Sequence, residues 1–217
     1  NIASVNNQII SPRENKPIIT IVQDTLLGIN KLTKGETIKY IPKLNDEMYH
    51  SNNTNIYPIQ KGSEDSVKEI IEETQYFTKQ QMMNIICECS TFTGFIPEPS
   101  YEINGVQFWS GKKITSSIIP EHINLTMENA SYDNNKNDTL NKVVVEKGEL
   151  KSGALDKGVF TKTSKGFIHT IFNDVSPKRT KEFIDDLQKL ACNSLLIEGF
   201  SIGIGDMIAG QGYQIKT

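Results

Sequence analysis

The residues that could do chemistry in this chain are few, and the strongest pattern is a glycine-rich stretch near the C-terminus. Residues Gly199–Ala209 place Gly203 and Gly205 among apolar side chains and carry one carboxylate, Asp206. Repeated glycines mark positions that need a positive φ or a close approach of the backbone. Two interpretations stay open: a helix end followed by a turn and a buried strand, or a polar loop set against a ligand or a large partner.

Gln23 and Asp24 form a second candidate, because they follow an apolar run directly. Residues Ile18–Val22 are almost all β-branched and predict a buried strand. Polar groups at the end of a buried run must find hydrogen-bond partners. Asp24 is therefore interpreted either as the cap of a helix that begins at Thr25 or as a ligand contact.

The histidine and cysteine residues show no metal-site spacing. The segment Phe167–Phe172 predicts a strand, and within it His169 is a single imidazole between apolar neighbours, which favours a structural role over that of a ligand or a base. Cys87, Cys89 and Cys192 are odd in number and form no CxxC pair. They predict neither a disulfide framework nor a zinc site, and they indicate a reducing compartment.

No catalytic constellation is visible either. The chain has no serine elbow, HExxH motif, Walker loop or DxD carboxylate cluster. Asp185 and Asp186 are adjacent on a predicted helix and so do not face each other. A stand-alone enzyme for small molecules therefore has little support.

Composition restricts the function further. The 217 residues suffice for one large domain or two small ones, and the formal charge of −3 argues against a polyelectrolyte binder as a whole. No apolar run is long enough to span a bilayer, so we expect an intracellular protein without a membrane partner.

The elements that must position these residues predict an α+β fold. The clearest is a long helix over Pro177–Glu198, with Ser176 as N-cap and Gly199 as the residue that ends it. Asn104-Gly105 predicts a hairpin turn. Further helices are expected over Ser66–Phe77 and over Lys79–Cys89, and further strands over Val106–Phe108, Ile114–Ile119 and Val143–Val145.

Four stretches in order carry a family resemblance. They are Ile10–Gly28 with its Ser-Pro, Asn-Lys-Pro and Val-Gln-Asp-Thr-Leu-Leu-Gly segments, Trp109–Lys112, Gly148–His169 with Gly-Glu-Leu, Leu-Asp-Lys and Ile-His, and Gly199–Ala209. Together they resemble the largest subunit of multisubunit DNA-directed RNA polymerases, of the eukaryotic RNA polymerase II type. Arg13-Glu14 depart from that family's pattern.

The resemblance implies a pore domain over residues 1–175, with an insertion at about 43–92, and the start of a funnel domain over 176–217. In that family the region lies beneath the active centre, where nucleoside triphosphates enter and backtracked RNA 3′ ends leave. The implied partners are other polymerase subunits, RNA, nucleotides, template DNA and a transcript-cleavage factor. The aspartates that bind Mg²⁺ in the whole enzyme precede this region, so no catalytic residue, metal or cofactor is expected in this fragment.

The resemblance also assigns individual residues. Lys157 matches a basic position near the RNA 3′ end, although the second lysine that the family often has there is Gly158. Gln23 and Asp24 match a pair that supports the floor of the active centre. Gly203, Gly205 and Asp206 belong to a structural loop.

Two further expectations complete the sequence interpretation. The bias towards Asn, Ile and Lys suggests a large DNA virus or an AT-rich protist, which places the protein in a viral factory, virion or host cytoplasm if viral, and in the nucleus if cellular. The alternative function is a non-catalytic binding module that docks other polymerase subunits or a regulator.

Overall fold

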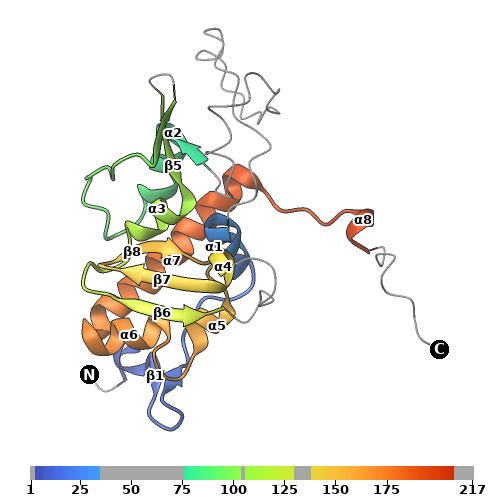
Figure 1. The fold of residues 1–217 in the computed structure, drawn as a ribbon. Helices are drawn as coiled ribbons and strands as arrows, with labels where there is room; N and C mark the ends of the chain where they lie inside the picture. The colour runs from blue at the N-terminus through green and yellow to red at the C-terminus, as the bar shows by residue number, and fades with distance from the viewer. Residues whose placement is uncertain (1–2, 35–75, 104–105, 130–137, 208–217) are drawn as a thin grey trace, which may run out of the picture.

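The computed structural model describes residues 3–34, 76–103, 106–129 and 138–207 (Figure 1). These residues form an α+β fold in which helices and three small antiparallel sheets share one hydrophobic core. The helix expected over Ser66–Phe77 lies outside the described residues as far as residue 75.

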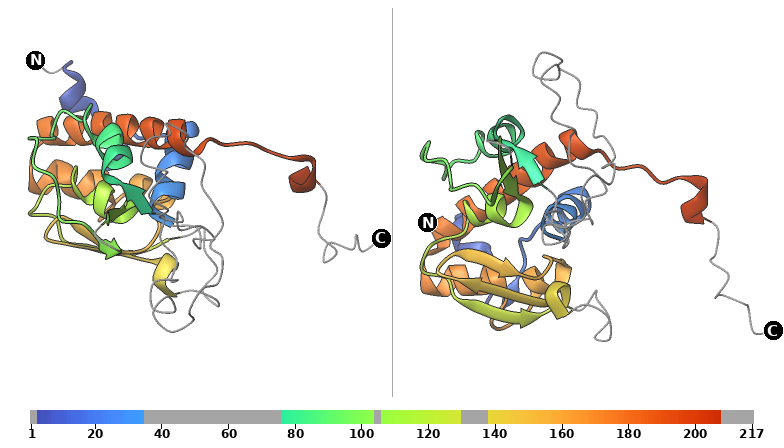
Figure 2. Two further views of the ribbon diagram at one scale, coloured as in Figure 1. Left: turned by 90° about the horizontal axis from the view of Figure 1, so that it is seen from above. Right: turned by 45° about the horizontal axis from the view of Figure 1, so that its top comes forward.

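The long C-terminal helix α7, Pro177–Glu198, organises this core. Ser176 accepts a hydrogen bond from the backbone N–H of Arg179 at 3.1 Å, and the N–H of Gly199 bonds the carbonyl of Leu195 at 2.7 Å. The predicted helix is therefore confirmed with both of its ends. Its apolar side packs on α1 (Asp24–Lys34), α2 (Lys79–Ile86) and α6 (Phe167–Asp174), as Figure 2 shows.

Helix α1 crosses α7 at very short range. Gly28 makes this possible, because a Cβ at that position would lie 2.8 Å from the carbonyl oxygen of Ala191. Ile29 and Leu32 of α1 are buried in the same contact. Any side chain at residue 28 would push the two helices apart.

Two three-stranded sheets lie on either side of helix α3 (Gly111–Ser116). In the first, β5 (Val106–Ser110) pairs with β3 (Tyr76–Thr78) and β4 (Tyr101–Ile103). In the second, β7 (Lys142–Glu146) pairs with β6 (Leu125–Glu128) and β8 (Glu149–Ser152). The predicted strands at Val106–Phe108 and Val143–Val145 are confirmed. The 104–105 turn itself lies outside the described residues.

The remaining elements are short and complete the chain. They are η1 (Val5–Gln8), β1 (Ile10–Ser11), β2 (Lys16–Pro17), α4 (Asp138–Asn141), α5 (Lys157–Thr161) and α8 (Ile204–Met207). The described part of the segment expected to be an insertion, residues 76–92, contributes Phe77 and Met82 to the common core. Its helix α2 begins at Lys79, as predicted, behind a capping box formed by Thr78 and Gln81, and it ends at Ile86 and not at the expected Cys89.

Three predicted strands are wrong. Phe167–Phe172 belongs to helix α6, where Phe167, Ile168 and Ile171 are buried at helical spacing against α7. Ile114–Ile119 overlaps helix α3 and the turn after it; Ser110 caps that helix by accepting a bond from the N–H of Lys113 at 3.2 Å. β-branched residues raise strand propensity, but packing on a neighbouring helix overrides it.

The run Ile18–Val22 is not a strand. The N–H groups of Ile18 and Ile19 both point to the carbonyl of Ile9, at 2.8 and 3.5 Å, so the chain bends away from the two-residue pairing of β1 and β2. Ile18 and Val22 are 61% and 60% exposed, against the expected burial, whereas Ile21 is 5% exposed and lies in the core. Tyr76 and Phe77, expected at the end of a helix, lie in β3.

Candidate functional site

Gln23 and Asp24 lie at the start of α1 on the protein surface, and both side chains are exposed. Gln23 has a φ of 50°, in the left-handed region that residues other than glycine seldom occupy. Its carbonyl accepts the N–H of Leu27 at 3.0 Å, so the helix begins at Asp24, one residue earlier than expected. Asp24 has no hydrogen-bond or ion-pair partner among the described residues, and its negative charge suits the first turn of a helix.

Lys157 is presented by a turn that α1 holds in place. Asn30 Nδ2 donates to the carbonyl of Leu155 at 2.9 Å, and the N–H of Leu155 donates to Thr33 Oγ1 at 2.9 Å. Asp156 is 5% exposed and caps α5 by accepting the N–H of Val159 at 2.9 Å. The Lys157 side chain is exposed and has no partner among the residues that the structure describes, so a fixed backbone carries an unpaired cation there.

The residues between β8 and this turn are also held by hydrogen bonds and close packing. The N–H of Ala154 donates to the carbonyl of Leu140 at 3.1 Å, and Asn129 Nδ2 donates to the carbonyl of Ala154 at 2.6 Å. Gly153 has a φ of 89°, and a Cβ there would lie 2.4 Å from the Cα of Val143. Only glycine fits this position, which delivers the chain from β8 into the Lys157 turn.

The glycine-rich stretch leaves the body as an extended arm, residues 199–207, that ends in α8 (Figures 1 and 2). The buried strand of the first interpretation is not found in the described residues of the arm: Phe200, Ile202 and Ile204 are 57%, 67% and 83% exposed. The arm starts at Gly199 with a φ of 68°. Gly203 lies in this arm, and Gly205 and Asp206 belong to its terminal helix α8.

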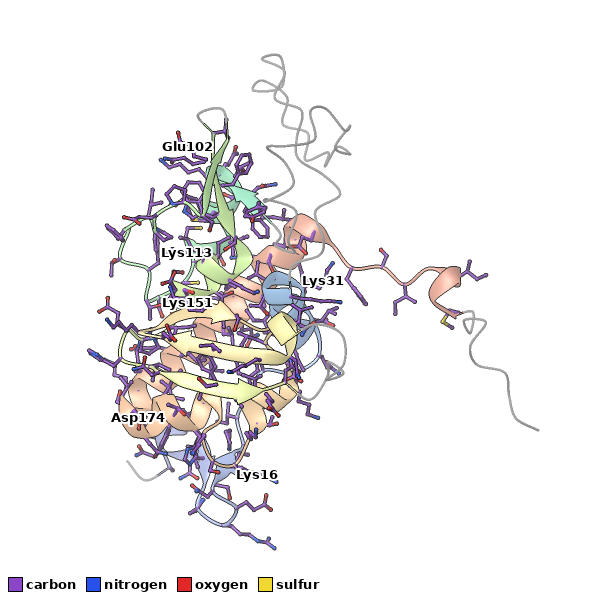
Figure 3. The ribbon with its side chains drawn as sticks, viewed as in Figure 1. Lys16, Lys31, Glu102, Lys113, Lys151 and Asp174 are labelled. Carbon is purple, nitrogen blue, oxygen red and sulfur yellow. The ribbon has the colours of Figure 1, made fainter. Side chains whose placement is uncertain are left out.

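Lys31 of α1 holds the base of the arm (Figure 3). Its ammonium group donates to the carbonyl of Gly199 at 3.0 Å and lies 3.6 Å from the carboxylate of Glu198. The Glu198 side chain is 7% exposed, so this ion pair is partly shielded from water. Helix α1 therefore connects all three sequence-predicted segments: Gln23-Asp24, the Lys157 turn and the glycine arm.

His169 joins two of the sequence motifs. Its Nε2 lies 3.2 Å from Asn15 Oδ1, and its Nδ1 lies 3.1 Å from Asn173 Nδ2. Asn15 has a φ of 49° in the turn between β1 and β2. The imidazole ring thus links the turn between β1 and β2 to α6. This contact corresponds to a structural role for His169.

A comparison with protein families decides the identity. The model described as RNA polymerase Rpb1, domain 3 matches residues 8–207. The chain belongs to this family. It is part of the largest subunit of a DNA-directed RNA polymerase, a nucleotidyltransferase that works as an assembly of subunits.

The matched range of this Rpb1 domain includes all the sequence-predicted site residues. It spans Gln23, Asp24, Lys157 and the arm, along with the α1 residues that join them. Sequence reasoning named the segments but missed Asn30, Lys31 and Thr33, which make the connections. Their signal was weak, because polar residues on an amphipathic helix ordinarily face water.

Sequence reasoning also missed a buried carboxylate. Asp186 of α7 is completely buried and accepts four hydrogen bonds: from Ser90 N at 2.6 Å and Oγ at 2.9 Å, and from Thr91 N at 3.0 Å and Oγ1 at 2.7 Å. Burial raises the pKa of Asp186, but the bonds from Thr91 and Ser90 outweigh it and leave that pKa below its ordinary value. The neighbouring Asp185 is on the surface and pairs with Lys181 at 2.7 Å.

A metal site, a groove and a membrane span are the other features of this Rpb1 domain that could indicate a function. Among the described residues, no group of three or more His, Cys, Asp and Glu side chains could hold a metal ion. A shallow groove over β6, β7 and β8, lined by residues such as Asn124, Thr126 and Lys151, contains none of the predicted site residues. None of the helices described here is both long and apolar enough to cross a membrane.

Proposed function

We propose that this chain forms the pore of the polymerase, over residues 1–175, and the start of its funnel, over residues 176–217. Nucleoside triphosphates enter and backtracked RNA 3′ ends leave through this channel, and a transcript-cleavage factor inserts through it. The fragment supplies no catalytic group, so its role is to shape and charge the passage. The Mg²⁺ chemistry then belongs to another part of the enzyme.

One observation carries this proposal: Lys157 is an exposed cation on a rigid support, without an acidic partner in the described ranges. Both backbone polar groups of Leu155 are bound by α1, and the carboxylate of Asp156 is bound within α5. An ordinary surface lysine has no such supporting structure. A cation held at a defined place attracts phosphates by a long-range field that salt weakens.

Gln23 and Asp24 have a supporting role in the proposal. The left-handed φ of Gln23 is a strained conformation that surrounding structure must maintain. Its exposed side chain and that of Asp24 are available to groups outside this domain, such as those of the active-centre floor.

The test is Lys157→Ala in the assembled polymerase. Elongation and pausing are measured across nucleotide and salt concentrations, with Lys79→Ala as a matched control, since Lys79 is also the exposed first residue of a helix. Lys157→Ala should weaken nucleotide capture or retention of backtracked RNA by a few fold, more at low salt than at high salt. Equal behaviour of the two variants at low salt and limiting nucleotide would overturn the role of Lys157.

The alternative, a module that docks other subunits or a regulator, is favoured by the arm. Its exposed Phe200, Ile202 and Ile204 are apolar side chains of the kind that interfaces bury. The two functions are compatible, and they separate in experiment: replacing the three arm residues by serine should impair assembly, whereas Lys157→Ala should not.

We further propose a polymerase of the RNA polymerase II type. The Asn, Ile and Lys bias favours a large DNA virus, with action in a viral factory, virion or host cytoplasm; a cellular enzyme would act in the nucleus. Localisation of the tagged subunit tests this assignment. The purified chain alone should show no template-dependent RNA synthesis, and synthesis by it would refute the assignment as a non-catalytic fragment.

A further inference from the structure

Three lysines follow one another closely around α5: Lys157, Lys162 and Lys165, here called the basic turn. All three are exposed, and none has an acidic partner among the described residues. The chain as a whole carries more acids than bases, 26 against 23. Three unpaired cations within nine residues are therefore a local excess of positive charge.

The backbone brings the three lysines together. Helix α5 has five residues, so Lys157 and Lys162 lie roughly 8 Å apart along its axis, at 1.5 Å per residue. Gly166 lies against the carbonyl of Lys162, since a Cβ at Gly166 would come within 2.6 Å of that oxygen. Residues 162–166 thus form a tight loop, in which Lys165 adopts a φ of 62°.

Both ends of the basic turn are anchored in the core. Phe160 at the end of α5 and Phe167 at the start of α6 are fully buried, with ring centroids 6.0 Å apart. Thr161 Oγ1 donates to the carbonyl of Lys157 at 2.9 Å. The lysines therefore extend from one short, fixed segment of backbone.

The neighbouring charges do not cancel the excess. Asp156 is buried and engaged in capping α5. Lys16 of β2, the strand that packs on α5 and α6, is paired with Glu14, while the nearby Arg13 is exposed without a partner among the described residues. The local balance of this surface is positive.

We propose that Lys157, Lys162 and Lys165 form one phosphate-contacting surface, in which Lys162 and Lys165 supply the charge that Gly158 lacks. The inference rests on the proposed pore function and adds two residues to it. The ligand chemistry is a chain of phosphates, from either an RNA strand or a nucleoside triphosphate. An RNA strand spans several lysines at once, whereas a triphosphate is compact.

The test compares Lys162→Gln/Lys165→Asn with the parent enzyme in assembled polymerase. Asparagine is chosen at residue 165 because it tolerates positive φ. Lys79→Gln is the control, since Lys79 lies on α2, which is in the upper part of the molecule in Figure 1, whereas α5 is in the lower part. The readouts are retention of a backtracked RNA 3′ end at several salt concentrations and the nucleotide concentration for half-maximal elongation.

A direct binding measurement accompanies this assay. Anisotropy of a labelled single-stranded RNA on the 217-residue chain should give a salt dependence whose slope falls by about 1.4 in the double variant, at about 0.7 per lost phosphate contact. Inorganic triphosphate, added as a competitor at a total charge equal to that of the RNA, separates the two ligand sources. Strong competition favours the nucleotide as the ligand, and weak competition favours RNA. Gly158→Lys in the double variant should restore much of the binding, because it returns a cation to the same turn.

The outcomes separate the two proposals. A loss of about three-fold or more in RNA retention by the double variant, with rescue by Gly158→Lys, supports the basic turn. If Lys157→Ala weakens retention but the double variant behaves like Lys79→Gln, the basic turn is refuted and the pore proposal stands. If neither differs from the control, both are refuted.

Discussion

The buried carboxylate of Asp186 should contribute strongly to the stability of this domain, and Asp186→Asn tests it with little change in shape. Four charge-assisted hydrogen bonds at about 1.5–3 kcal/mol each set an upper limit of about 6–12 kcal/mol. Ser90 is exposed and Thr91 half-buried, so water replaces part of this loss. The hydroxyl groups can also rotate to accept a bond from the new amide, but a backbone N–H cannot.

The expected loss in the free energy of unfolding is therefore about 2–4 kcal/mol, close to the cost of one unpaired backbone N–H and one lost charged bond. Asp185→Asn is the matched control. Its carboxylate is on the surface and, within the described part of the chain, pairs only with Lys181, so the expected loss is about 0.5 kcal/mol or less.

The pH dependence gives a second, independent signature. The pKa of Asp186 in the folded chain is below its ordinary value of 3.8. The stabilisation is therefore complete above that ordinary value and is lost as the pH falls through the lower folded value. Asp186→Asn should remove this component of acid unfolding, so the stability difference between parent and variant should shrink below pH 4.

Urea unfolding, followed by circular dichroism between pH 2 and 7, measures both quantities. Two-state fits at each pH give the free energies to be compared. Equal stability of Asp186→Asn and Asp185→Asn at pH 7 would show that the four bonds contribute nothing net. A difference that stays constant down to pH 2 would show that charge is not the cause.

Three shorter predictions concern other features. Gly153→Ala should cost at least about 2 kcal/mol of stability in urea unfolding, because a Cβ meets the neighbouring strand, whereas Gly94→Ala, with similar φ and open space, should cost about 1 kcal/mol. Lys31→Met should speed hydrogen exchange at the base of the arm, residues 199–207, without changing exchange in α7; unchanged exchange at Gly199 would contradict the contact. Burial, followed by the carboxylate of Asp186, raises the pKa of Cys89 to about 12. A thiol reagent at pH 8 should therefore modify the exposed Cys87 and Cys192 quickly and Cys89 only on unfolding.

Local signals in the sequence were sufficient to predict elements whose bounds depend on residues close by in the sequence. The helix Pro177–Glu198 has a cap, a proline at its first position and a glycine after its end, and all three signals agree. The prediction of a strand at Phe167–Phe172 was wrong because the apolar residues there fit both the helical and the strand period. Packing against α7 favours the helix. No signal near residue 167 reveals that contact.

The candidate site divides in the same way. Gln23 and Asp24 were named by the apolar run before them and by the family resemblance, and Lys157 by the resemblance. The bonds that join the Lys157 turn to α1 link residues more than 120 positions apart. The Asp186 bonds likewise join residues 95 and 96 positions apart. Such pairings follow from the completed fold, and a single sequence holds no local trace of them.

The central place of α7 has a consequence for how the chain is made on the ribosome. Helices α1 and α2 bury their apolar sides against a helix that is synthesised after almost all the rest of the described chain. Until residues 177–198 emerge, Ile29, Met82 and Ile85 have no helix to cover them. Folding must therefore wait for the end of the domain, and the growing chain meets chaperones with its apolar surfaces still open.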